Sequence, residues 1–376
     1  MNRHLHIVCL DTPWPADYGG AIDMMNRIMM LKKMDIAIHL HYFSYNDRGT
    51  PNELNQFCES IRVYERKTGH KGFSFKLPYI IASRINEELI AVLQKDDHPI
   101  LLEGIHCTGI LSGLAIQKRK VVVRMHNEES IYYKELARSE KNLLKKIYFL
   151  NESRLLKKYN RHLPDECIYA CVSKEDIDTL HTDYHLNHTQ FLPTFPAWQQ
   201  VTGQEGAGNL CLYHGNLSVP ENEEAAIWLL QKVFSKVKKP FVIAGKNPTR
   251  RLEKQAHLCE HTCLVANPSE TEINDLIRKA HINVLPCFNK NITGIRLKLL
   301  HVLFEGRHCV VNKPMVEGTG LEPACHMGAN ANAFASIIAQ LYHQPFTEEE
   351  IRLRKQLLGN TYDNEKNTRQ LIQWLW

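Results

Sequence analysis

The sequence of 376 residues contains no apolar run that approaches the length of a membrane-spanning helix, so no helical membrane span is expected. Its first strand-like segment, residues 5–10, is too short and too interrupted by histidine for a secretory signal peptide. No internal repeat or low-complexity segment is present. Neither a G-x-S-x-G nucleophile motif nor a Walker phosphate loop occurs, so two common enzyme classes lack their signatures here.

Cysteine occurs eleven times, but the odd number and scattered positions provide no disulfide framework. Several of these residues, among them Cys9, Cys171, Cys211 and Cys309, lie in apolar strand-like runs, where cysteine packs as a small hydrophobe. We therefore expect a reducing compartment and a cytoplasmic protein.

Hydrophobic residues make up 44% of the chain and charged residues 23%, the profile of a soluble globular protein. The chain is too long for one ordinary core and long enough for two domains. Its net charge of +5 suits an anionic ligand or an acidic membrane surface. The charge is too small to indicate nucleic acid, and no nucleic-acid partner is expected.

Short β-branched runs alternate with amphipathic stretches of helical length, the pattern of parallel α/β layers. The predicted strands are residues 5–10, 36–43, 61–65, 100–103, 121–125 and 168–173, then 210–214, 241–244, 263–266, 282–285 and 308–312. The predicted helices include residues 20–34, 78–94, 223–237, 272–280 and 295–304. The sequence therefore predicts an α/β protein of two Rossmann-like domains that face a central cleft.

A turn-rich segment, residues 193–208, breaks this alternation with proline and glycine and is the predicted linker. It separates an N-terminal domain at residues 1–195 from a C-terminal domain at residues 205–360. The remaining residues, 361–376, end in Trp374-Leu375-Trp376 and are predicted to pack back on the first domain as a helix.

The first domain has two candidate ligand-binding positions, because ligands of open α/β sheets bind beyond the carboxyl ends of the strands. Gly19 and Gly20 follow the first strand and begin a helix, where free N–H groups favour a phosphate. His126 follows the strand at residues 121–125 and can donate to a sugar hydroxyl or act at the reacting centre. A tight turn and a structural histidine are the plainer interpretations, but the placement after the strands favours function.

The second domain repeats the strand–glycine–helix junction several times. Gly215 and Asn216 follow its first strand, and Lys246 ends the next one as a candidate phosphate partner. Residues 291–298 lead into a helix, with Gly294 at its start and Arg296 and Lys298 as nearby positive charges. Each lysine or arginine alone is equally consistent with a solvated surface, but several such junctions in one chain favour diphosphate binding.

Two groups of residues resemble metal-binding motifs, but a different interpretation fits each of them better. His257, Cys259, His261 and Cys263 alternate into a strand and do not match a zinc-finger spacing. Asp176 and Asp178 follow Ser173 in a predicted first helical turn, where acidic side chains favour the helix dipole. No metal ligand and no cofactor are therefore predicted.

Residues 134–161 carry nine lysines and arginines with leucine and isoleucine between them. The pattern predicts a basic amphipathic helix, either solvated and packed on its own domain or in peripheral contact with an acidic membrane.

Taken together, these junctions resemble family GT4 of the GT-B glycosyltransferases over nearly the whole chain. Residues 13–20 resemble the family's N-terminal glycine loop, and residues 121–128 its strand with a cleft histidine. Residues 215–222 and 242–248 resemble two glycine junctions of the donor domain, and residues 293–311 its donor helix. The resemblance implies transfer of a sugar from a nucleoside-diphosphate sugar to a glycan or lipid-linked acceptor, with retention and without a metal.

The resemblance also implies residue roles. His126 approaches the donor sugar, Gly20 and Gly294 lie near the phosphates, and Arg296 and Lys298 balance the charge of the departing diphosphate. The family's pair of glutamates falls on Thr293 and His301, and its usual basic residue after the strand-end glycine is Asn216. His301 can still hydrogen-bond a ribose hydroxyl.

Three hypotheses remain open at this point. The first is a retaining glycosyltransferase. The second is a nucleotide-sugar epimerase or hydrolase on the same scaffold, with Glu103, Glu128 and Glu317 as candidate carboxylates. The third is a catalytically impaired nucleotide-sugar-binding protein, suggested by the absent glutamate pair.

Overall fold

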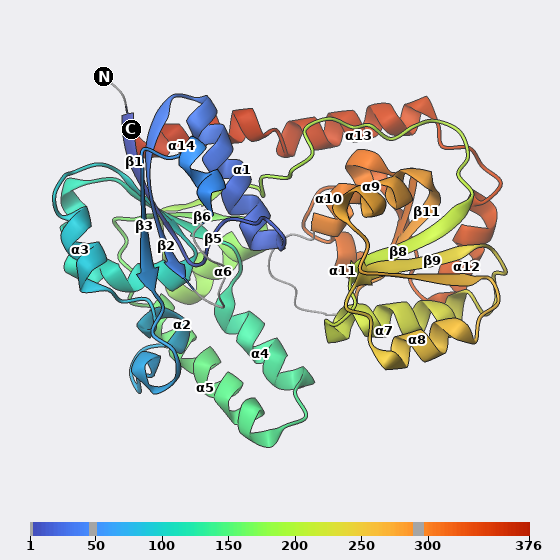
Figure 1. Ribbon diagram of the computed structural model, residues 1–376, viewed down its shortest axis with the longest axis horizontal. Coiled ribbons are helices and arrows are strands. Elements are labelled where there is room, and N and C mark those ends of the chain that lie inside the picture. Colours follow the sequence, from blue (N-terminus) through green and yellow to red (C-terminus); the bar gives the residue numbers. More distant parts are fainter. Residues whose placement is uncertain (1–2, 45–50, 289–296) are drawn as a thin grey trace. The chain divides into compact units, whose positions relative to one another are not determined.

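A computed structural model describes residues 3–44, 51–288 and 297–376 (Figure 1). These residues form two compact units, one containing residues 3–44, 51–197 and 362–376 and the other containing residues 198–288 and 297–361. The chain thus passes from the first unit to the second and returns to the first for its final helix.

The first unit contains a parallel sheet of seven strands in the order β3-β2-β1-β4-β5-β6-β7. The strands are β1 (Arg3–Cys9), β2 (Ile36–Ser44), β3 (Ser60–Glu65), β4 (Ile100–Glu103), β5 (Val121–Met125), β6 (Ile168–Cys171) and β7 (Thr189–Phe191). Strand β5 is buried along its whole length, which suits its run of valines. The order reverses between β1 and β4, and such a topological switch point is where open α/β sheets bind ligands.

Helices cover both faces of this sheet. One face packs against α1 (Gly19–Lys33) and α14 (Asn364–Leu375), with Met24, Ile28, Leu371 and Leu375 in the shared core. The other face packs against helices that contribute Ile81, Leu89, Leu156 and Leu180; these are α2 (Tyr79–Ala82), α3 (Glu87–Leu93), α5 (Leu143–Asn160) and α6 (Lys174–Tyr184). Burial of α14 explains why the chain returns to this unit at its end.

The second unit contains a parallel sheet of six strands in the order β10-β9-β8-β11-β12-β13. The strands are β8 (Leu210–Asn216), β9 (Phe241–Lys246), β10 (Thr262–Ala266), β11 (Ala280–Leu285), β12 (His308–Val311) and β13 (His326–Met327). Its helices are α7 (Pro220–Trp228), α8 (Arg250–His257), α9 (Glu270–Lys279), α10 (Leu297–Glu305), α11 (Lys313–Val316), α12 (Ala331–Leu341) and α13 (Glu348–Thr361). Each sheet therefore runs outward from its first strand on both sides, and the prediction of two Rossmann-like domains is confirmed.

Several predicted elements were wrong in detail. The single basic helix predicted over residues 134–161 is two helices, α4 (Glu129–Ser139) and α5, because Asn142 accepts hydrogen bonds from the amides of Leu144 and Lys145 and begins a new helix. The helix predicted over residues 78–94 is also divided, into α2 and α3, with Asn86 as the N-cap of the second. The short edge strands β7 and β13 were not predicted at all.

In the part of the chain that the structure describes, no helix has both the length and the apolar character needed to cross a bilayer.

Candidate functional site

His126 lies just beyond the carboxyl end of β5, at the centre of a cluster of charged side chains. Its Nε2 is 3.1 Å from Oε2 of Glu103, the last residue of β4, and its Nδ1 is 3.5 Å from Oδ2 of Asp23 in α1. Because β4 and β1 flank the switch point of the sheet, the cluster lies where the topology predicts a ligand.

Two buried arginines neutralise the carboxylates of this cluster. Arg27 donates to both oxygens of Glu103, at 2.8 and 2.9 Å, and to Asp23 at 2.7 Å. Arg124, the fourth of the five residues of β5, donates to Asp23 at 3.2 Å from both Nε and Nη2. Burial of four ionised groups is unfavourable because each loses its hydration. These charge-assisted hydrogen bonds offset that loss.

The arginines also keep the two acids ionised. Burial opposes ionisation of Asp23, but Arg124 and Arg27 hold the pKa of its carboxyl well below the usual range. Burial opposes ionisation of Glu103 in the same way, and Arg27 together with His126 lowers the pKa of Glu103. His126 therefore faces two carboxylates that carry negative charge at neutral pH.

His126 is the member of the cluster that reaches solvent. Its side chain is 13% exposed, whereas those of Asp23 and Glu103 are 3% and 1% exposed. The carboxylate of Glu103 orients the ring through Nε2, which is how acidic partners position catalytic histidines. The arrangement can hold an imidazole edge at a fixed position against a bound sugar.

Asp23 and Arg124 further connect the site to residues 192–195, the segment that leaves the first unit toward the second. Its Oδ1 accepts from the amide of Phe195 at 2.7 Å, and Arg124 donates to the carbonyl oxygens of Leu192 and Pro193. Sequence reasoning missed Asp23, Arg27 and Arg124 as site residues. The available signals were a charged pair four residues apart on an apolar helix face and an arginine within a run of valines.

Gly19 and Gly20 are the first two residues of α1, beyond the carboxyl end of β1. The N-cap Tyr18 forms no side-chain capping bond, and the first turn of the helix contains no acidic residue. The predicted glycine pair is thus at a helix N-terminus with exposed or half-buried backbone, as an anion-binding role requires.

In the second unit, three of the predicted donor-binding residues come together around Asn222. This side chain donates to the carbonyl of Asn216 at 2.9 Å and accepts from Nζ of Lys298 at 2.9 Å. A Cβ atom on Gly215 would lie 3.3 Å from the same side chain. Lys298 from α10 is thereby held at the junction between β8 and α7, beside the switch point between β8 and β11.

Lys246 is exposed at the end of β9 and is paired in register with Asn216 at the end of β8. The two strands approach closely at Gly245, where a Cβ atom would lie only 1.8 Å from the carbonyl oxygen of Gly215. A side chain at position 245 would therefore separate the ends of the strands, and glycine is required there.

His301 is engaged within the second unit. Its ring stacks on Trp198 with centroids 4.1 Å apart, and its Nε2 lies 3.3 Å from Oε2 of Glu305. Glu305 in turn accepts from Arg278 at 2.8 Å. Contact of His301 with a ribose hydroxyl remains a prediction. Gly294 and Arg296, and also Thr293, lie outside the described residues.

Asp23, Glu103 and His126 place ligand atoms within 4.8 Å of one another, a spacing that a metal ion could bridge. Both carboxylates, however, already pair with guanidinium groups of Arg27 and Arg124. A divalent cation here would face two fixed positive charges at close range, so the arginines make this cluster a poor metal site.

No family model matches the chain. It is 27% identical over 335 residues to an uncharacterized 44.6 kDa protein in the cps region of Klebsiella pneumoniae, with 84% of each chain covered. Among solved structures, sucrose-phosphate synthase from Thermosynechococcus elongatus is 12% identical with a TM-score of 0.71, covering 99% of this chain and 98% of that one. This chain has the GT-B glycosyltransferase fold.

Two further GT-B structures are similar over nearly their whole length. A mutant of S. aureus TarM in complex with Fondaparinux, alpha-GlcNAc-glycerol and UDP is 10% identical with a TM-score of 0.65, covering 100% of both chains. Anabaena HepE in complex with UDP and glucose is 9% identical with a TM-score of 0.62, covering 98% of both chains. These likenesses extend over both Rossmann-like domains of the GT-B fold.

Proposed function

We propose that this protein is a glycosyltransferase that moves a sugar from a nucleoside-diphosphate sugar to a glycan or lipid-linked acceptor, with retention and without a metal. The observation that carries the proposal is the position of His126 at the switch point of the first sheet. Its side chain reaches solvent, whereas the carboxylates that it contacts are buried and paired with arginines. The GT-B fold supports it, since similar structures contain UDP.

The proposed role of the second unit is to hold the nucleoside diphosphate. Departure of a diphosphate develops negative charge that fixed cations or dipoles must stabilise. Lys298, held by Asn222 beside Gly215 and Asn216, and the exposed Lys246 would supply positive charge at the carboxyl ends of β8 and β9. Glycines at these strand ends allow close approach of the phosphates to the backbone.

The proposed role of the first unit is to position the sugar. His126, oriented by Glu103, would contact a sugar hydroxyl, and the start of α1 at Gly19 and Gly20 would approach the phosphates. Retention at the anomeric carbon rests on the resemblance to family GT4. Independence of metal rests on the same resemblance and on the pairing of Asp23 and Glu103 with arginines, which removes both carboxylates as cation ligands.

A lipid-linked acceptor is favoured by the tip of the α4–α5 hairpin, whose helices lie side by side (Figure 1). Leu143, Leu144 and Ile147 are 73%, 79% and 64% exposed, and Lys141 and Lys145 beside them are also exposed. An apolar ridge flanked by lysines matches the surface of an anionic membrane. We infer peripheral membrane association of a cytoplasmic enzyme through this hairpin tip.

The epimerase or hydrolase alternative needs a carboxylate available for proton transfer, and each of the three candidates already has polar partners. Glu103 pairs with Arg27, and exposed Glu317 pairs with Lys313 at 3.1 Å. Glu128 accepts from Ser130 and Ile131 on one oxygen and from Asn160 and Tyr184 on the other. These contacts favour transfer over epimerisation.

The test is a thermal-stability screen of the full chain with UDP-, GDP- and ADP-sugars, since a bound donor stabilises the fold by mass action. The stabilising donor is then incubated with and without glycan and lipid-linked acceptors, and products are identified by mass spectrometry. Sugar transfer to an acceptor supports the proposal. Epimerised or hydrolysed donor without any transfer, or stabilisation without turnover across the acceptors, would refute it in favour of the two alternatives.

A further inference from the structure

Three side chains of the second unit converge at the end of its sheet away from the donor-binding residues. His308 is the first residue of β12, His326 is the first residue of β13, and Glu350 belongs to α13. The strands β8, β11, β12 and β13 are parallel, so the amino ends of β12 and β13 lie at the end of the sheet opposite to Gly215 and Asn216, which are at the carboxyl end of β8. The cluster is therefore separate from the proposed donor site.

The ligand atoms of the three side chains face one another. Nδ1 of His308 is 3.2 Å from Nε2 of His326 and 3.2 Å from Oε1 of Glu350, and the remaining separation, His326 Nε2 to Glu350 Oε1, is 3.8 Å. Metal–nitrogen bonds near 2.0 Å in tetrahedral geometry place neighbouring ligands about 3.3 Å apart. The observed spacing thus needs little adjustment to surround one ion.

Hydrogen bonds outside the cluster fix which atoms point inward. Nε2 of His308 is 3.1 Å from the carbonyl oxygen of Gln344, which can only accept, so this nitrogen carries its hydrogen. The Nδ1 of a neutral His308 then presents a lone pair to the carboxylate oxygen. Oε2 of Glu350 accepts from the amide of Thr347 at 2.9 Å and from its hydroxyl, which leaves Oε1 toward the histidines.

Nδ1 of His308 and Oε1 of Glu350 both present lone pairs to the centre of the cluster, and these repel unless a positive centre lies between them. That centre is a proton, carried by Nδ1 of His308 or by Nε2 of His326, or it is a metal ion. Two imidazoles and one carboxylate are a ligand set that Zn²⁺ uses, with water in the fourth position. His308 is 3% exposed, whereas His326 and Glu350 are 34% and 31% exposed, so the open side can admit an ion and a water molecule.

We propose that His308, His326 and Glu350 form a binding site for a divalent transition-metal ion, Zn²⁺ by preference. The ion would join β12 and β13 to α13. Its role would be structural, since it lies at the amino ends of the strands and the donor residues lie at the carboxyl ends. The carbonyl of Gln344 and the Thr347 backbone are the outer contacts that hold two of the three ligands in place.

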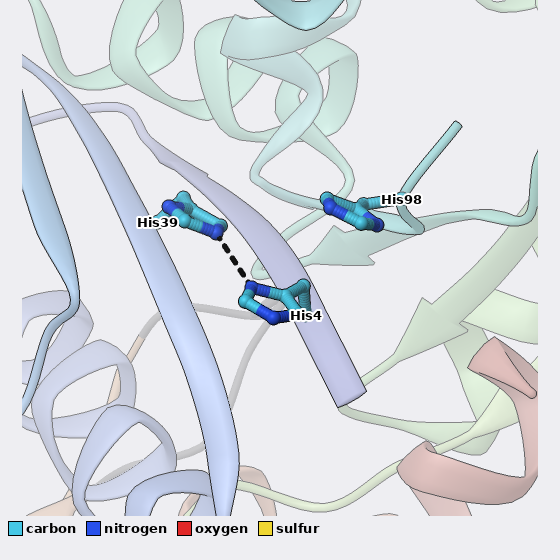
Figure 2. A group of neighbouring side chains, drawn as sticks. All are labelled: His4, His39 and His98. Atoms are coloured by element: carbon cyan, nitrogen blue, oxygen red, sulfur yellow. Dashed lines mark hydrogen bonds between the residues drawn. The ribbon is translucent and has the colours of Figure 1, made fainter. Parts of the chain in front are cut away.

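A second histidine group, in the first unit, provides an internal comparison. His4, His39 and His98 have ligand atoms within 4.8 Å of one another, and Figure 2 shows one hydrogen bond in this group, between His4 and His39. Nδ1 of His4 and Nε2 of His39 are 3.0 Å apart, and Nδ1 of His39 is 2.8 Å from the hydroxyl of Ser60. A shared proton can satisfy this pair just as it can satisfy His308 and His326. No carboxylate belongs to this group, however, so it lacks the anionic ligand that Glu350 supplies to the proposed site.

The experiment uses the full chain without a histidine tag, stripped of metal by a chelator and titrated with Zn²⁺ or Co²⁺. Metal content after desalting and the visible spectrum of Co²⁺ are measured for the unaltered protein and three variants. We expect one bound ion per chain, with affinity more than about 10-fold weaker in Glu350→Gln and in His326→Gln. The matched control His39→Gln retains the affinity of the unaltered protein.

No bound metal in the unaltered protein, undiminished binding in Glu350→Gln and His326→Gln, or loss of binding in His39→Gln would each overturn the proposal. Circular dichroism shows whether the variants are folded. If they are not, the Co²⁺ spectrum of the unaltered protein and of His39→Gln decides: four-coordinate d–d bands without thiolate charge transfer support the site, and thiolate bands would assign the ion to cysteine and refute it.

Discussion

Nε2 of His126 and Oε2 of Glu103 lie 3.1 Å apart, and Arg27 holds the same carboxylate through two hydrogen bonds of 2.8 and 2.9 Å. Glu103 therefore cannot turn away from the imidazole without breaking a buried ion pair. The ring is held by the fold rather than by a ligand, which is the preorganisation that a reacting centre needs.

Replacement of His126 by alanine should reduce the rate of sugar transfer by about 100-fold or more, the usual contribution of a positioned acid, base or donor. Stability should change little, because Asp23 and Glu103 keep their arginine partners. Initial rates with the donor and acceptor that the screen selects give the test, and exposed His162→Ala serves as the control. Full turnover by the alanine variant at position 126 would contradict the assigned role.

The Arg27→Met variant should destabilise the first unit by about 3–5 kcal/mol, because it leaves Asp23 and Glu103 buried with one partner fewer. Amide hydrogen exchange at β4 and β5 measures the stability of the first unit separately from that of the second. The control Arg369→Met removes an exposed ion pair with Glu365 and should leave the exchange unchanged. Equal protection in both variants would show that the buried network contributes no stability.

The stability of the first unit should fall as the pH rises through neutrality because of Glu129. Burial is the main cause that raises the pKa of Glu129 from 4.5 to about 7. Its stabilising contribution is complete below the unfolded pKa of 4.5 and is lost as the pH rises to and through the folded pKa, because the unfolded chain ionises in water while the folded protein still holds the proton. Glu129→Gln removes this titration.

At about pH 8 the Glu129→Gln variant should be more stable than the unaltered protein by up to about 3 kcal/mol, and at about pH 4 the two should be equal. Denaturation curves across this range give the comparison, with exposed Glu166→Gln as the control. A difference that grows toward acid pH would have the wrong sign for a raised pKa and would reject the assignment.

The Lys298→Met variant should bind UDP about 10-fold more weakly, the effect of removing one charge-assisted contact. The hydrogen bond between Lys298 and Asn222 places this ammonium at the junction of β8 and α7. Calorimetric titration with UDP measures the affinity, and exposed Lys254→Met on α8 is the matched charge control. Identical weakening in both variants would indicate a general effect of net charge instead of a local contact.

The double variant Leu144→Asp, Ile147→Asp should lose at least about 10-fold in partition onto vesicles containing anionic lipid, because each apolar side chain contributes roughly 1.5–3 kcal/mol when buried. Leu258→Asp is the control, since Leu258 is 76% exposed but lies in the second unit. Co-sedimentation at low and high salt also separates the contribution of the lysines. Unchanged partition of the double variant would exclude the hairpin tip as the membrane contact.

Local residue patterns were sufficient to predict much of the fold. The valine run at β5 and the apolar spacing of α1 predicted their elements closely, because burial and backbone preference act within a few residues. The predicted helix at residues 134–161 is divided by a single side chain, Asn142, which caps the start of α5. The composition of this segment also favours a continuous helix, so the sequence pattern did not show the division. Short edge strands such as β13 carry too few residues for a periodic signal.

The sequence by itself determined the alternation of strands and helices, the two Rossmann-like domains and the position of His126 after a strand, since each follows from local periodicity. Only the tertiary structure decided that Asp23, Arg27, Glu103 and Arg124 surround this histidine, and that His308, His326 and Glu350 meet elsewhere. Each group is assembled from segments that are distant in the chain, the first from α1, β4 and β5 and the second from β12, β13 and α13. Their meeting depends on strand order and side-chain packing, which periodicity does not encode.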